Sequence, residues 1–175
     1  MMLRFARWHI WLGWLAGFPI LMWAVTGLVM VARPIDEVRG DHLQAAPATL
    51  ADGDYVFPTV GEPFIRAELM QQATGPVWLV TTADGARQRY FAPDGSLMPP
   101  VIESEAREIA EATYTGEGTL EALTYAPGDT PPVELRAAVD TWQAEFSDGA
   151  NVYIDALTGE VLAVRTGWWR GYDFM

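Results

Sequence analysis

An uncharged run near the N-terminus constrains this chain more than any other feature. It extends from Trp8 to Ala32 and contains no Asp, Glu, Lys or Arg. As an α-helix it would be about 37 Å long, at about 1.5 Å per residue. That length crosses a hydrocarbon core of about 30 Å, and a helix satisfies its own backbone hydrogen bonds in lipid. We therefore expect a transmembrane anchor here, with the lipid bilayer as the first partner.

Two other interpretations of this run stay open. A cleaved signal peptide has an apolar region of about 7–15 residues and a cleavage site with two small residues. A cut after Ala32 would place Met30, which is not small, in that site, and Pro34 would lie just beyond it. A buried core helix would need the rest of the chain to wrap the whole run. The length of the run favours the anchor over both.

The charges around the run favour one orientation. Arg4 and Arg7 precede it, Arg33 and Arg39 follow it, and all 23 acidic residues lie after it. The positive-inside rule then favours, weakly, an N-terminus inside the cell and a domain outside the cytoplasm.

One face of the expected helix combines a histidine with two glycines. His9, Gly13 and Gly17 are spaced by four residues, which places them on the same side of a helix. Gly13 and Gly17 form a small-xxx-small pair that allows close packing of another transmembrane helix or a flat ligand. His9 is either an interfacial histidine that contacts water and headgroups or an axial ligand to haem. Glycine is also common in membrane helices, so the spacing alone leaves these alternatives open.

The remainder of the chain predicts an α+β domain after a linker. Gly and Pro recur through residues 34–61, and we assign this stretch as the linker and 62–166 as the domain. We expect helices at 62–73 and 104–114, the first with an apolar side of Phe64, Ile65, Leu69 and Met70, the second capped by Ser104. Strands are expected at 77–82, 88–91, 119–125, 141–146, 151–154 and 161–164, with turns at the Asp-Gly and Thr-Gly pairs between them.

A weak internal repeat supports this architecture. Residues 90–97 resemble residues 153–161, since each stretch reads as a strand, a turn with glycine and a strand. Two such units, each a helix followed by antiparallel strands, predict helices packed on antiparallel sheet.

Composition excludes several functions. The net charge of −12 argues against nucleic-acid binding, and the absence of cysteine removes disulfides, thiolate nucleophiles and cysteine-held metals. Only His9 and His42 are available as bases, and no serine lies in a nucleophile elbow. We therefore predict no catalytic residues and no metal site. Glu103, Glu105, Glu108 and Glu111 are interpreted as a solvated helix face.

Three segments together resemble the PepSY-domain proteins with PepSY-associated transmembrane helices. They are Arg7-Trp8-His9 with Gly13 and the later Trp23-Ala24 and Gly27-Leu28, Ser104 to Glu111, and Val152 to Val161. The resemblance implies a bacterial inner-membrane protein whose PepSY domain lies in the periplasm and binds or inhibits a peptidase or peptide. Some relatives look like haem-containing membrane reductases linked to iron uptake, and His9 matches their early helix histidine, which implies haem b as a cofactor.

The end of the chain departs from this pattern. Relatives continue into a further transmembrane helix, whereas residues 167–175 form only an aromatic, membrane-proximal tail. We expect this tail to be either an interfacial belt or the start of a missing second helix. The leading hypothesis is thus a membrane-anchored interaction module without catalysis, and the alternative is a haem-binding component of an electron-transfer or iron-uptake system.

Overall fold

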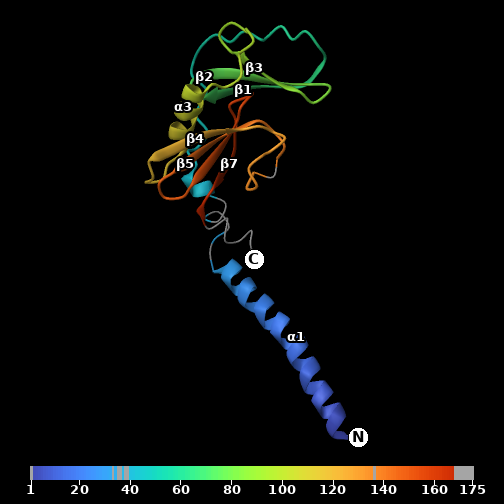
Figure 1. Ribbon diagram of the computed structural model, residues 1–175. Helices are drawn as coiled ribbons and strands as arrows, with labels where there is room; N and C mark the ends of the chain where they lie inside the picture. The colour runs from blue at the N-terminus through green and yellow to red at the C-terminus, as the bar shows by residue number, and fades with distance from the viewer. Residues whose placement is uncertain (1, 33, 35–36, 38–39, 136, 168–175) are drawn as a thin grey trace.

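A long helix stands apart from a folded domain in the computed structural model (Figure 1). The structure describes residues 2–32, 34, 37, 40–135 and 137–167. Helix α1 spans Met2–Val31, and its apolar part, Phe5–Val29, is long enough to cross a membrane and is not buried in the chain. The predicted helix is therefore confirmed, and it begins six residues earlier than expected. A helix that is apolar on all sides needs apolar surroundings. Because the protein core does not provide them, lipid is the environment that agrees with this helix.

The domain contains two antiparallel sheets. The three-stranded sheet has the order β1-β2-β3 and the four-stranded sheet the order β4-β5-β6-β7. Helix α3, Glu103–Thr113, connects the two sheets in the chain. This arrangement confirms the predicted α+β class. The strands are β1 Phe64–Gln72, β2 Gly75–Thr82, β3 Arg87–Phe91, β4 Leu120–Ala126, β5 Thr141–Phe146, β6 Asn151–Asp155 and β7 Val161–Arg165.

The helix predicted at 62–73 is wrong, because this segment forms β1. Its backbone pairs with β2 in a continuous register from Arg66↔Thr81 to Gln72↔Gly75, across a tight turn. Gly75 has a φ of 132°, a conformation that few other residues adopt. Leu69 and Met70 are neighbours in a strand, so they point to opposite faces of the sheet instead of sharing one side of a helix. Pairing with an apolar neighbouring strand overrides the helical propensity of the segment.

Helix α3 covers the four-stranded sheet. Its buried side chains Ala106, Ile109 and Ala110 pack against Phe146, Val152, Ile154 and Val164. The helix was predicted, but its predicted cap, Ser104, is wrong. Ile102 is the N-cap residue and makes no side-chain cap hydrogen bond, so Ser104 lies inside the first turn. On the other face of this sheet, Tyr153 packs with Leu135 and donates a hydrogen bond to Glu134 at 2.7 Å.

The two repeated hairpins share their turn geometry. Gly95 and Gly159 both have φ of 72°, and their N–H groups donate to the carbonyls of Phe91 and Asp155 at 2.8 and 2.9 Å. The repeat is therefore present at the level of the hairpin. The units differ before it, because β1 stands where the first unit was expected to have a helix.

The segment assigned as the linker runs along both sheets. The short helix η1, Asp41–Leu43, is followed by pairing of Gln44 with Tyr114, and Phe57 later packs on Phe64 and Trp78 of the three-stranded sheet. At the other end, a Cβ on Gly40 would lie 3.1 Å from the Val164 carbonyl oxygen. The domain therefore begins and ends at one place beside β7. The predicted tail lies outside the described residues from 168 onward.

Candidate functional site

A fully buried arginine lies between the two sheets. Arg89 is on β3, in register with Leu79 of β2 and, one strand further, Glu68 of β1. Because side chains alternate along a strand, this row faces α3. The Arg89 side chain is only 1% exposed.

Arg89 is held by acceptors from three segments. Its two terminal nitrogens donate to the two carboxylate oxygens of Glu105 on α3, at 2.6 and 3.1 Å. They also donate to Oε1 of Gln72 at 3.2 Å and to the carbonyl of Pro99 at 3.2 Å. A bidentate pair of this kind fixes the orientation of both partners. The ion pair therefore fixes α3 against the three-stranded sheet.

A second contact connects the sheets directly. Gln72 donates from Nε2 to the carbonyl of Thr158 at 2.8 Å, in the turn between β6 and β7. A Cβ on the adjacent Gly159 would lie 2.9 Å from a terminal nitrogen of Arg89. Glycine thus permits the turn to approach the guanidinium, and Arg89, Glu105, Gln72 and the 158–159 turn form one polar joint.

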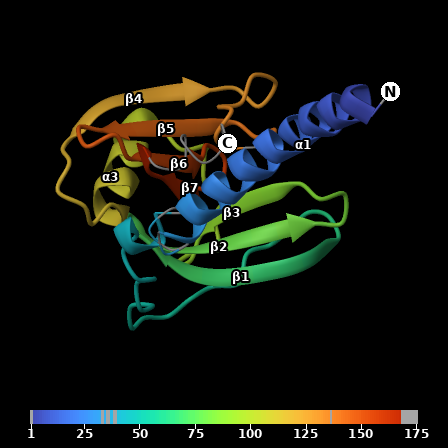
Figure 2. The ribbon, with the colours of Figure 1, turned by 90° about the horizontal axis from the view of Figure 1, so that it is seen from below.

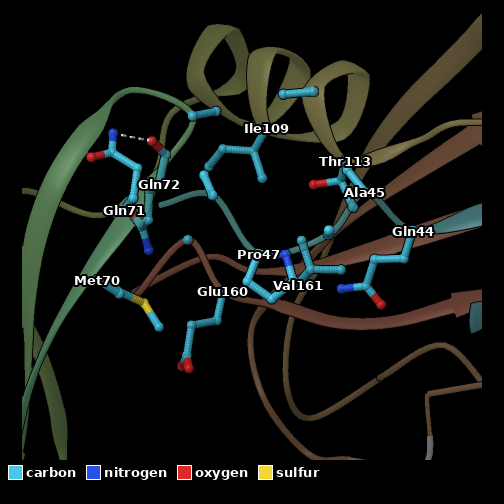
Figure 3. A pocket seen from close by; sticks show the side chains of 15 residues that line it. Gln44, Ala45, Pro47, Met70, Gln71, Gln72, Ile109, Thr113, Glu160 and Val161 are labelled. Atoms are coloured by element: carbon cyan, nitrogen blue, oxygen red, sulfur yellow. Dashed lines mark hydrogen bonds between the residues drawn. The ribbon is translucent and has the colours of Figure 1, made fainter. Parts of the chain in front are cut away.

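A pocket of about 300 Å³ opens beside this joint (Figure 3). Its walls come from the segment Gln44–Ala48, which we call the strap, from the end of β1, from α3 and from the start of β7. Met70, Ile109, Pro47 and Val161 supply apolar surface. Glu160 is the one charged residue among those that line it, and it forms an ion pair with Arg87.

An exposed apolar patch lies on the opposite face of the three-stranded sheet and at its edge. The rings of Phe57 and Phe64 pack in a tilted arrangement with centroids 5.8 Å apart, and both residues are about half exposed. Ile65, at a bulge in the β1–β2 pairing, is 72% exposed. Val56 adds a fourth exposed side chain. We refer to Val56, Phe57, Phe64 and Ile65 as the apolar patch.

On α1, the structure gathers the two predicted glycines in one hollow. Gly13 and Gly17 line it together with Ile10, Trp14, Phe18 and Leu21. A Cβ on either glycine would meet nothing within 4 Å. His9 is exposed one turn before Gly13 and is not among the residues that line the hollow.

Comparison with known proteins gives one match. A family model for the PepSY-associated TM region matches residues 6–175. The chain belongs to this family. No curated protein and no solved structure matches it.

Membership in the PepSY-associated TM family confirms the resemblance predicted from the sequence. The match includes both α1 and the domain, so the protein is a membrane-associated PepSY module with one membrane-spanning helix among the described residues. The family match does not assign a role to His9, Gly13 or Gly17, which stay predictions.

Sequence reasoning missed the polar joint of this PepSY-associated protein. Glu105 was grouped with the solvated acids of α3, yet it is the partner of Arg89. Glu103 does pair with Arg107 along the exposed side of the helix, and Glu108 and Glu111 are exposed. The signal in the sequence was an arginine within a predicted strand, but its partner is fixed only by the docking of α3. Among the described residues, no group of three His, Asp or Glu side chains is placed to hold a metal ion.

Proposed function

We propose that this PepSY-associated protein is a membrane-tethered interaction module that binds a segment of a protein partner, such as a peptidase, and has no catalysis of its own. The observation that carries the proposal is the apolar patch beside the outer edge of β1. In the described part of the chain, β1 has β2 as its one strand neighbour. Exposed apolar patches on small domains commonly mark protein interfaces.

An extended peptide fits this edge. In an antiparallel ladder, alternate residues direct their backbone N–H and C=O groups away from the paired strand. Pro76 of β2 accepts from Ala92, on the β3 side. Its partner in register, Gln71, therefore directs its backbone outward, as do Leu69 and Ala67 at alternate positions. Because Ala51 N–H donates to Oε1 of Gln71 at 3.3 Å, a partner strand would pair nearer Ala67, beside the apolar patch. A partner strand would pair with such groups and rest its side chains on the apolar patch.

The proposal is tested by a matched pair of surface changes in the full-length protein. Ile65→Glu places a charge in the apolar patch. Val133→Glu places the same charge outside the patch, at a residue that is 84% exposed in the loop before β5. Tagged proteins are recovered from native membranes after mild crosslinking. We expect the partner with the unchanged protein and with Val133→Glu, and its loss with Ile65→Glu. Equal recovery with both variants would refute the role of the patch.

The absence of catalysis is part of the same proposal. It is supported by the sequence, which offers only His9 and His42 as histidine bases. Incubation of the purified protein with a panel of peptide substrates should give no turnover. Turnover that His42→Ala abolished would contradict the proposal.

We propose that the domain lies in the periplasm, with the N-terminus in the cytoplasm of a bacterium. The basic residues Arg4 and Arg7 before the span and the acidic domain after it support this orientation. Protease added to spheroplasts should digest the domain and leave an N-terminal tag intact. A domain that was digested only after the membrane was permeabilised would reverse the orientation.

A haem-binding role is the second candidate, and the glycine hollow beside His9 is the observation that favours it. His9 would supply one axial imidazole, and the bare surface at Gly13 and Gly17 would admit a flat macrocycle. The only other histidine, His42, lies in η1 beyond the helix, so a second histidine ligand would come from another helix. The visible spectrum of the membrane-extracted protein tests this idea. A Soret band lost in His9→Ala and kept in His42→Ala would support it, and no band after haem supplementation would refute it.

A further inference from the structure

We infer that the pocket beside the polar joint is a recognition subsite for a peptide segment in which an apolar side chain stands next to a lysine or arginine. This inference rests on the proposed function, because it names what the interaction module recognises. It concerns the inner face of the three-stranded sheet, whereas the apolar patch lies at the outer face and edge.

The size and lining of the pocket define the first part of the ligand. About 300 Å³ is at the lower limit for sites that hold whole small molecules. It suits one inserted side chain, and Met70, Ile109 and Val161 provide apolar contacts for it. At the rim, the exposed side chain of Gln44 offers an amide donor and an acceptor (Figure 3). A peptide backbone has the matching groups, since each residue carries one donor and one acceptor.

The charge around the pocket defines the second part of the ligand, the cationic side chain. Among the described residues, no lysine or arginine lines it, and Glu160, the one charged lining residue, is already paired with Arg87, so the unpaired charge beside the pocket comes from α3. Glu108 is exposed on α3 and precedes the lining residue Ala112 by one helical turn, so it lies on the side of the helix that borders the pocket. A cationic side chain next to the inserted residue is therefore attracted, and an anionic one is repelled.

The walls of the pocket are held by several bonds. The strap is fixed to the end of α3 by the hydrogen bond from Ala45 N–H to the Thr113 carbonyl at 2.8 Å, and just before the strap Thr115 N–H donates to the Leu43 carbonyl at 3.0 Å. On the other side, the Arg89–Glu105 pair holds α3 against the sheet. A pocket with fixed walls loses little conformational entropy when a ligand binds.

The test uses the full-length protein in nanodiscs and three labelled peptides with Gly-Ser flanks. Their centres are Lys-Leu-Lys, Glu-Leu-Glu and Lys-Gly-Lys, and binding is followed by fluorescence anisotropy. We expect Lys-Leu-Lys to bind about tenfold or more tightly than either of the others, because one loses the charge match and the other the buried side chain. Equal affinity for all three peptides, or no binding of Lys-Leu-Lys, would overturn the inference.

Variants locate the binding. Ala112→Trp and Ala48→Trp fill the pocket from opposite walls at exposed positions, and Ala83→Trp is the matched change on an exposed residue outside it. Binding of Lys-Leu-Lys should fall about tenfold in both pocket variants and persist in Ala83→Trp, with circular dichroism confirming the fold of each. Two pocket variants are used so that misfolding of one leaves the test intact. Undiminished binding in a folded pocket variant would overturn the inference.

A charge comparison separates Glu108 from the general acidity of the domain. Glu108→Gln should weaken Lys-Leu-Lys binding, whereas Glu111→Gln, at an exposed glutamate on the side of the same helix away from the pocket, should not. Equal weakening by both changes would overturn the assigned charge contact. If Lys-Leu-Lys does not bind but the partner is still recovered in a way that depends on Ile65, the subsite alone is refuted. The reverse result would refute the role of the apolar patch and leave the subsite standing.

Discussion

At the scale of single residues, Arg89 has the largest expected effect on stability. Its guanidinium is out of water, and Glu105 is the carboxylate that offsets its charge. Removing one partner of a buried ion pair leaves an uncompensated charge and costs about 3–5 kcal/mol, whereas replacing both is often nearly neutral.

We therefore expect Glu105→Gln to lower the free energy of unfolding by about 3–5 kcal/mol, and the double change Arg89→Met with Glu105→Gln to cost less. The measurement is denaturant unfolding of the detergent-solubilised protein followed by circular dichroism. The matched control is the exposed pair Arg66 and Glu68, where Glu68→Gln should cost under about 1 kcal/mol. Similar costs at the two glutamates would contradict the role given to the buried pair.

Tyr114 gives a prediction about pH at the same scale. Burial, and then the hydrogen bond that its hydroxyl donates to Asp148, raise the pKa of Tyr114 to about 12 from an ordinary value of 10.0. The unfolded chain therefore loses this proton at lower pH than the folded chain. The stability due to the neutral phenol is fully present below about pH 10 and falls as the pH rises toward 12.

The free energy of unfolding should thus decrease above about pH 10, and less steeply in Tyr114→Phe. Tyr90 and Tyr125, whose pKa values are also raised, will leave a residual slope. Unfolding measured at several pH values between about 9 and 11.5 tests this. Identical pH dependence in the two proteins would show that Tyr114 does not contribute.

At the scale of secondary-structure elements, the turns were predictable and the first strand was not. The Asp-Gly and Thr-Gly pairs mark turns because glycine adopts positive φ without strain, and Gly85, Gly95, Gly149 and Gly159 all do so. Segment 64–72 contains good helix formers, and only its pairing with β2 makes it a strand. For the same reason neither the pocket nor the polar joint could be predicted, since both require the docking of α3 and the strap.

The turn between β6 and β7 provides a test of this docking. Gly159→Ala should destabilise the protein by about 1–2 kcal/mol from backbone conformation alone, and further because its Cβ would lie 2.9 Å from a nitrogen of Arg89. Gly85→Ala is the control, with φ of 91° and no atom within 4 Å of the added Cβ. The difference in free energy of unfolding between the two variants measures the crowding at Arg89. A larger loss in Gly85→Ala would contradict the geometry of the joint.

At the scale of the whole molecule, the place at which the domain connects to α1 determines which surface faces a partner. Gly40 and Val164 lie against each other beside β7, so the connection to α1 leaves from the four-stranded sheet. In Figure 1 the three-stranded sheet lies beyond it, on the side of the domain away from α1, and Figure 2 shows both sheets as seen from the α1 side. The apolar patch is thus displayed away from the membrane-spanning helix, where a second protein has access to it.

Site-specific photo-crosslinking in intact cells tests this account most directly. A photoreactive residue replaces Ile65 in the full-length, membrane-inserted protein, and the same residue replaces Val133 in a parallel strain. We predict a discrete crosslinked protein partner from position 65 and none from position 133. The same adducts from both positions, or no protein adduct from position 65, would contradict the account.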